Sequence, residues 1–178
     1  AKVKGDMTIK VPESVTGVKE WECTVIGNRH AATFITEYKV ALPAGEHMHF
    51  EPGSYAQIKI PAFDISYNDF DKELIGDVYL PFWNNNKMFD LRCVNPTETI
   101  RAYSMANYPD EGDIITLNVR IATPPMKPRF KMDPKTNKPI LGEDGKPVPN
   151  VLAPGESPFI DVNPGIASSY IFNLKPGD

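Results

Sequence analysis

Proline is the residue that most limits the folds open to this chain. Eighteen prolines are spread over 178 residues, against twelve glycines. Proline fixes φ and lacks a backbone N–H, so it interrupts helix interiors and the hydrogen-bond ladder of central strands. The composition therefore favours strands, turns and long ordered loops over a helical bundle. The length fits one domain that is large enough to bury a hydrophobic core.

Charge and cysteine content exclude several classes of function. The net charge of −4 leaves no polybasic surface, so nucleic acid is not expected as a partner. No apolar run approaches the roughly 18 residues that span a bilayer, and we expect this segment to be soluble, without direct membrane insertion. Cys23 and Cys93 lie in no C-x-x-C spacing and are predicted to be free thiols rather than metal ligands. His47 and His49 lack a third ligand nearby, so no metal site is predicted.

Alternation of apolar and polar residues predicts most of the secondary structure. In residues 113–122, Ile115, Leu117, Val119 and Ile121 fall on one face of a strand. The other predicted strands cover residues 21–25, 33–42, 55–60, 88–94 and 101–104. A helix is predicted over 164–174, with Asn163 as its N-cap and Pro164 at its first position.

Two segments interrupt this pattern, and one precedes it. Residues 62–90 mix acidic and aromatic side chains, which predicts an ordered insertion packed on the sheets. Residues 126–160 are rich in Lys, Pro, Gly and Asp, and a small excursion hairpin is expected there. Residues 1–20 are polar with little periodicity, which indicates a linker or arm.

Two short motifs carry candidate chemistry. Residues 101–104, Arg-Ala-Tyr-Ser, combine a guanidinium, an aromatic ring and a hydroxyl, which suits an aromatic, phosphorylated ligand. The alternative is an edge strand with a surface arginine. Residues 165–168, Gly-Ile-Ala-Ser, open the predicted helix, whose first N–H groups can bind a diphosphate. An ordinary helix start packed against a strand is the alternative there.

The order of these motifs resembles a known family. Arg-x-Tyr-Ser, a hydrophobic strand and a Gly-x-x-Ser helix that ends in Lys-Pro-Gly-Asp resemble the FAD-binding domain of the ferredoxin-NADP reductase superfamily. Residues 101–109 and 118–125 are similar, more narrowly, to the F subunits of Na⁺-translocating NADH:quinone oxidoreductases. The fold that this implies is all-β, a six-stranded antiparallel Greek-key barrel with one capping helix. The barrel domain is expected to cover 21–178, with insertions at 62–90 and 126–160.

The resemblance also implies roles for individual residues. Tyr103 corresponds to the residue that stacks on the isoalloxazine, Ser104 to the hydroxyl near the reactive N5, and Arg101 to the residue that grips the diphosphate. Tyr103 and Ser104 are thus the implied catalytic positions. The full set of implied FAD-binding residues is Arg101, Ala102, Tyr103, Ser104, Asn118, Val119, Arg120, Ile121, Gly165, Ile166, Ala167, Ser168 and Ser169.

The implied activity is that of an NADH-dependent flavin oxidoreductase. FAD is expected to accept a hydride from NADH and pass electrons singly to a 2Fe-2S centre elsewhere in the intact subunit. Other subunits of a Na⁺-translocating, ubiquinone-reducing complex, on the cytoplasmic side of the bacterial inner membrane, are the expected partners. The NADH-binding domain, the iron–sulfur domain and the last barrel strand are expected to lie outside these 178 residues. The alternative is a non-catalytic β-barrel that acts as a binding or docking module.

Overall fold

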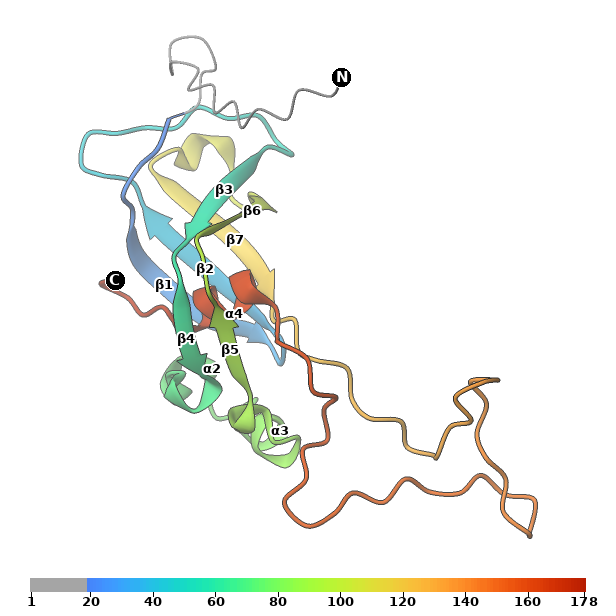
Figure 1. The fold of residues 1–178 in the computed structure, drawn as a ribbon. Helices are drawn as coiled ribbons and strands as arrows, with labels where there is room; N and C mark the ends of the chain where they lie inside the picture. The colour runs from blue at the N-terminus through green and yellow to red at the C-terminus, as the bar shows by residue number, and fades with distance from the viewer. Residues whose placement is uncertain (1–18) are drawn as a thin grey trace, which may run out of the picture.

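Three antiparallel sheets organise the computed structural model, which describes residues 19–178 (Figure 1). The predicted linker at residues 1–20 therefore lies almost wholly outside the described residues. The largest sheet has three strands in the order β1 (Thr24–Ala32), β2 (Ile35–Ala41) and β7 (Ile114–Arg120). The other two sheets are the pairs β3 (Tyr55–Ile60) with β6 (Thr99–Ser104), and β4 (Phe63–Ser66) with β5 (Arg92–Asn95).

The two small sheets are successive halves of one bent ribbon. The β3–β6 pairing ends at Ile60 and Thr99, and the β4–β5 pairing begins at Phe63 and Asn95. Pro61 and Pro96 stand in the two gaps, where a missing N–H prevents the ladder from continuing. The Asn95 side-chain amide donates to Pro61 O at 2.7 Å and bridges the break. The prolines thus divide one long ribbon into two short pairs.

The prediction of an all-β chain is confirmed, but the strands of residues 19–178 do not close into one six-stranded barrel. β6 approaches β7 where the Ala106 N–H donates to Thr116 O at 2.8 Å. The Asn107 side chain continues this contact, because its Oδ1 accepts from the Thr116 N–H at 3.0 Å. Beyond that contact the ribbon containing β6 bends away, so the two sheets remain separate in their hydrogen bonding. A short 3-10 turn, η3 (Pro109–Glu111), links β6 to β7.

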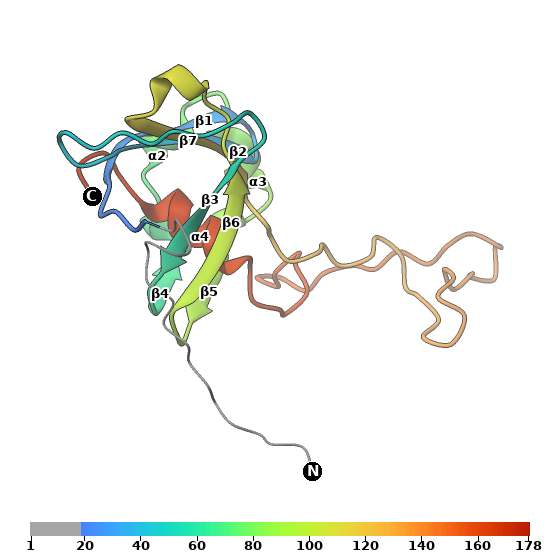
Figure 2. The ribbon, with the colours of Figure 1, turned by 90° about the horizontal axis from the view of Figure 1, so that it is seen from above.

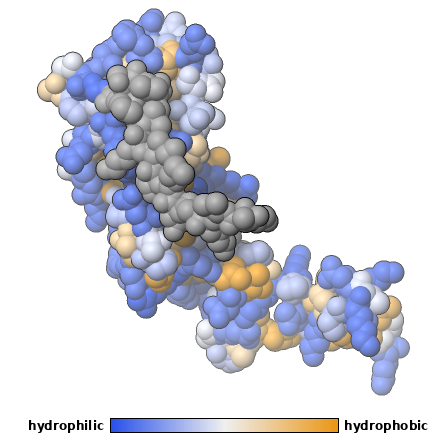
Figure 3. Space-filling model, turned by 45° about the horizontal axis from the view of Figure 1, so that its top comes forward, coloured by the Kyte–Doolittle hydropathy of each residue, from blue (hydrophilic) through white to orange (hydrophobic). Residues whose placement is uncertain are grey.

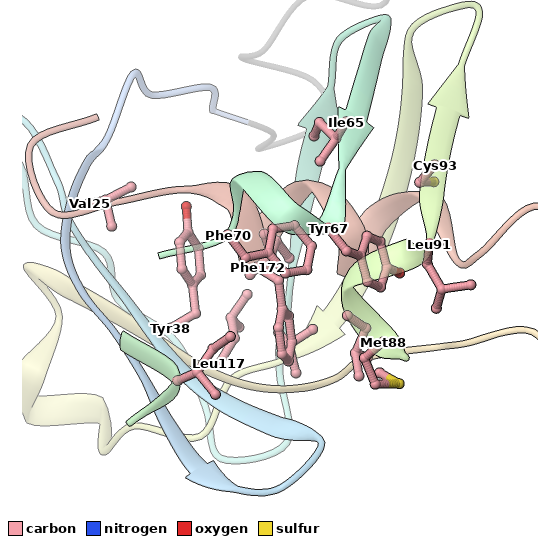
Figure 4. Close-up of a cluster of buried hydrophobic side chains, with 14 of the residues drawn as sticks. Val25, Tyr38, Ile65, Tyr67, Phe70, Met88, Leu91, Cys93, Leu117 and Phe172 are labelled. Atoms are coloured by element: carbon pink, nitrogen blue, oxygen red, sulfur yellow. The ribbon is translucent and has the colours of Figure 1, made fainter. Parts of the chain in front are cut away.

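Four short helical segments follow β4, within the segment that was expected to form an ordered insertion. They are η1 (Tyr67–Asp69), α2 (Lys72–Ile75), α3 (Leu80–Asn85) and η2 (Met88–Asp90). Trp83 is fully buried, its ring stacks on Phe172 with centroids 6.2 Å apart, and its Nε1 donates to Thr33 O at 2.8 Å. Figure 4 shows Tyr67, Phe70 and Phe172 gathered in the same core. These segments therefore close the end of the β1–β2 hairpin with aromatic packing.

The last helix, α4 (Ile166–Asn173), packs against β4, β5, β7 and η1. Its C-terminal end is fixed by Asn28, whose amide donates to Ile171 O at 2.6 Å and to Leu174 O at 2.7 Å. Thr36 Oγ1 in turn donates to Asn28 Oδ1 at 2.7 Å, so both polar side chains are satisfied in the core.

The predicted start of this helix is wrong by two residues. Gly165, not Asn163, is the N-cap. Asn163 instead exchanges hydrogen bonds with the backbone of Val94, because its Oδ1 accepts from Val94 N–H and its Nδ2 donates to Val94 O, each at 3.0 Å. The side chain that was expected to cap the helix therefore extends the edge of β5.

Residues 126–160, here called the arm, project from the body (Figures 1 and 2). Two isolated antiparallel bridges, Met126 with Phe159 and Phe130 with Pro149, join its outgoing and returning branches, and two more, Met132 with Pro139 and Leu141 with Pro147, close its two turns. Asn137 and Gly145 have positive φ, of 52° and 71°, at its two tight turns. Among residues 19–178, no helix is both long and apolar enough to cross a membrane.

Candidate functional site

The Arg-Ala-Tyr-Ser motif occupies the end of β6. Arg101 is exposed, and Tyr103 two residues later is half-buried. Burial raises the pKa of Tyr103 while the Arg101 charge opposes that rise, so the two side chains are electrostatic neighbours. Ser104, on the opposite face, is exposed and pairs with Tyr55 of β3. The strand ends at Ser104, as is required if that hydroxyl is to reach a ligand lying over Tyr103.

The predicted site residues 118–121, on β7 and just after it, are alternately exposed and buried. Val119 and Ile121 are buried, whereas Asn118 and Arg120 are exposed. Val119 and Ile121 therefore offer a ligand only their backbone. The Ala106 N–H, just after β6, donates to Thr116 O of β7, and Ser104 and Asn118 each lie two residues from that contact.

The start of α4 is joined directly to the end of β7. The Gly165 N–H donates to Ala122 O at 2.7 Å, and the Ala122 N–H donates to Ser168 Oγ at 3.0 Å. A Cβ atom at position 165 would lie 2.6 Å from the Ala122 Cβ, closer than real Cβ contacts come. Glycine at 165 thus allows the helix start to sit on the strand.

The two serine hydroxyls of this helix bond within the chain. Ser168 Oγ donates to Gly165 O at 3.1 Å, and Ser169 Oγ donates to the same carbonyl at 2.7 Å. Both side chains are buried. What the helix offers an anion is therefore its backbone, because no side chain of the described residues caps the first turn at Ile166 and Ala167. The first N–H groups of a helix lack intrahelical acceptors and carry a partial positive charge.

Arg120 is the arginine that adjoins this helix start. A shallow depression of ≈ 220 Å³ is lined by Arg120, Ile121, Ala122 and Thr123, and the end of β7 leads straight to the Ala122–Gly165 contact. Arg101 stands on β6 instead, where its Nη1 donates to Ile100 O at 2.8 Å. Figures 1 and 2 show α4 beside the junction of β5 and β6, so the two motifs flank one region without direct bonds between them.

Sequence reasoning missed a second depression beside this region. It measures ≈ 440 Å³ and is lined by Pro52, Ala106, Asn107, Tyr108, Pro109 and Asp110. Tyr108 is 66% exposed there. Asn107 fixes the loop, since its Nδ2 donates to Ile114 O at 2.8 Å. The only signal in the sequence was an Asn-Tyr-Pro turn directly after the motif.

Metal-ligating residues are scattered in the part of the chain that the structure describes. Residues 19–178 contain no group of three or more His, Cys, Asp or Glu side chains that could hold a metal ion. Cys23 and Cys93 are free, and burial raises the pKa of both thiols. His47 and His49 have ring centroids 4.6 Å apart, but they form only a pair.

Comparison with known proteins gives one consistent result. The chain is 54% identical to the F subunit of the Na(+)-translocating NADH-quinone reductase of Pseudoalteromonas haloplanktis, 47% to that of Serratia proteamaculans and 44% to that of Methylococcus capsulatus, each over 176 residues. Each alignment covers 99% of this chain, but 47% of the first relative and 35% of the other two. The chain thus spans between a third and a half of the length of these relatives. No protein-family model matches it.

Proposed function

We propose, from the homology of this chain to a segment of the F subunits of Na⁺-translocating NADH-quinone reductases, that it binds FAD for electron transfer in such a complex. The relatives are named for an oxidoreductase that uses NADH and a quinone, and the segment that they share with this chain includes both candidate motifs. The proposal extends that name to a cofactor and to particular residues.

One observation carries the proposal. The uncapped start of α4 lies directly against the end of β7 that carries the exposed Arg120. Backbone N–H groups at a helix start, together with a guanidinium, suit a diphosphate, because each supplies donors and positive charge. Glycine at 165 adds support, since it keeps the helix start close to the strand. The residues present therefore fit the diphosphate of a dinucleotide flavin.

The proposal also assigns roles to the other site residues. Arg101 on β6 serves as the second diphosphate ligand, and the half-buried ring of Tyr103 provides a face for the isoalloxazine to stack on. The exposed hydroxyl of Ser104 donates a hydrogen bond to the ring near N5, and Asn118 binds the ribityl side. Bound FAD supplies the hydride and single-electron chemistry, while these residues orient the ring and neutralise the diphosphate.

The wider activity goes beyond the printed name of the relatives, which gives NADH, quinone and Na⁺, and belongs to the same proposal. In the complex, hydride comes from NADH and electrons leave one at a time toward a 2Fe-2S centre elsewhere in the full-length protein. The complex stands at the cytoplasmic side of the bacterial inner membrane, and its other subunits are the protein partners. A six-stranded Greek-key barrel in the full-length protein is part of the same proposal: residues 19–178 leave it open, and the contact of β6 with β7 at Ala106 and Thr116 supports it.

Flavin titration tests the proposal. The 178-residue chain should bind FAD more tightly than FMN, because FMN lacks the diphosphate. Replacing Arg120 or Arg101 by Gln should weaken FAD binding roughly tenfold to hundredfold, the effect of losing a charge-assisted contact of about 1.5–3 kcal/mol. Tyr103→Phe keeps the stacking ring and should bind nearly normally. Arg29→Gln, an exposed arginine on β1, is the control. Equal affinity for the two flavins, or equal binding by all variants, contradicts the proposal.

A further inference from the structure

We infer that the arm, residues 126–160, is a docking element for an acidic protein surface on another subunit of the assembly. This inference rests on the proposed function, because it takes the chain to be part of a complex with several subunits. Beyond that proposal, it names the segment of this chain that contacts another subunit and the chemistry of the surface that it contacts.

Hydrogen bonds and one ion pair fix the base of the arm. The Lys127 N–H donates to Pro158 O at 2.7 Å, and the Ile160 N–H donates to Pro125 O at 2.9 Å. Lys87 of the helical segment donates from Nζ to Glu156 O at 3.1 Å, and Lys127 forms an ion pair with the Glu156 carboxylate at 2.6 Å. The Lys87 bond ties the base of the arm to the body, the other bonds join its two branches there, and beyond them the arm projects from the body (Figures 1 and 2). A partner therefore meets a preorganised segment, which lowers the entropic cost of association.

Apolar side chains are exposed along the arm. Val151 is 83% exposed, Leu141 60%, Ile140 43% and Phe130 40%. A two-branched ribbon has no second layer on which to bury them, and Figure 3 shows hydrophobic residues along the arm. Exposed apolar side chains grouped on one projecting segment are typical of a protein interaction site.

The charge of the arm defines the partner. The arm holds six Lys or Arg and four Asp or Glu, a net charge of +2, whereas the rest of the chain holds thirteen and nineteen, a net charge of −6. Within residues 19–178, no ion pair involves Arg129, Lys131, Lys135 or Lys138. Arg129 and Lys131 flank Phe130, and Lys138 lies two residues before Ile140, so an acidic surface with apolar patches complements this part of the arm.

Acidic residues at both turns favour a protein over an anionic lipid surface. Asp133 Oδ1 accepts from the Lys135 N–H at 2.8 Å, and Asp144 Oδ1 accepts from the Lys146 N–H at 3.1 Å. Both carboxylates are therefore fixed at the two turns of the arm. Lipid phosphates repel them, whereas a protein surface can present donors to them and acids to the neighbouring cations.

Protection of single cysteines tests the inference. Leu141→Cys and Val151→Cys are introduced into the full-length protein, and maleimide labelling is followed by mass spectrometry of the peptide that carries each new cysteine. Val78→Cys on the body is the matched control, because Val78 and Val151 are both 83% exposed. At one or both arm positions, labelling should slow at least roughly tenfold in the purified complex relative to the isolated protein, while position 78 is unchanged.

Charge reversal then identifies the chemistry. Adding Arg129→Glu with Lys131→Glu should restore fast labelling in the complex, whereas Arg29→Glu with Lys175→Glu, the same charge change on the body, should not. Equal labelling of both arm positions in the isolated protein and the complex overturns the inference. Protection by phosphatidylserine vesicles, or by raising the concentration of the isolated protein, overturns it in favour of a membrane or a second copy. Bound flavin is measured in the same samples, so loss of flavin with protection intact counts against the proposed function alone.

Discussion

His30 is a half-buried side chain whose environment suits only its neutral form. Its ring lies among Tyr79, Trp83 and Phe172, and its Nδ1 is buried without a hydrogen-bond partner among the described residues. Burial lowers the pKa of His30 from 6.5 to about 4. The unfolded chain therefore binds one more proton than the folded chain between these two pH values.

This difference predicts acid sensitivity. The stabilising contribution of neutral His30 is complete above the unfolded pKa and is lost as the pH falls from 6.5 toward 4. Between pH 7 and pH 4 this should lower the unfolding free energy of the wild type by on the order of 1–2 kcal/mol, less than for a fully buried ring because His30 is partly exposed. His30→Phe, which keeps an aromatic ring there, should not show this loss. Thermal unfolding between pH 7 and pH 4 measures it, with the exposed His49→Gln as control. Parallel curves for wild type and His30→Phe would refute this explanation.

The buried hydroxyl groups of Tyr67 and Ser169 form a hydrogen bond, and removing one should cost more than removing the other. Ser169 Oγ donates its proton to Gly165 O, so the Tyr67 hydroxyl, 2.8 Å away, must be the donor to Ser169 Oγ. Ser169→Ala leaves the buried Tyr67 donor without a partner and should cost about 1–3 kcal/mol. Tyr67→Phe leaves the Ser169 proton bonded and should cost less, about 0.5–1.5 kcal/mol. Urea unfolding of both variants decides it, and a larger cost for Tyr67→Phe would contradict the assigned direction.

Among the elements, α4 depends most on one close approach. Gly165 has φ −63°, which alanine also adopts, so the backbone itself tolerates Gly165→Ala. The added Cβ would lie 2.6 Å from Ala122 Cβ and 2.9 Å from Ser168 Oγ, and the resulting shift should cost about 1–3 kcal/mol in unfolding free energy. Gly27→Ala in β1, whose Cβ would lie 3.6 Å from that of Lys39, should change it little. Equal stability of the two variants would show that α4 moves freely on β7.

Elements formed by local periodicity could be predicted, and those formed by distant contacts could not. In β2, β3 and β7 the alternation of apolar and polar residues follows from one face being more buried than the other. The observed strands therefore lie within the predicted ranges. The helical segments between β4 and β5 have no such period. Their placement depends on distant partners, since Trp83 Nε1 donates to Thr33 O and the Tyr67 hydroxyl bonds to Ser169 Oγ. The motif at 101–104 is contiguous and could be recognised from the sequence. The hydrogen bond that Ser168 accepts from Ala122, 46 residues away, could not.

The whole molecule divides into a packed body and an arm that adds little to its stability. None of residues 130–149 is buried, whereas the brace at Lys127 and Pro158 lies outside that range. The Asn150 N–H donates to Arg129 O at 2.9 Å, so these two residues are placed to close a hairpin on a two-residue Asn-Gly turn.

Replacing residues 130–149 by Asn-Gly should therefore leave the body intact. Only exposed or half-buried groups are removed and the loop becomes shorter, so the unfolding free energy should change by less than about 1 kcal/mol. FAD binding should stay within about twofold of wild type, because Arg120 and the start of α4 keep their contacts. Trp83→Ala, which opens a core cavity, should cost about 3–5 kcal/mol in the same denaturation series. A loss of similar size in the shortened chain would make the arm part of the folded core, and its exposed side chains would then require a structural explanation instead of a partner.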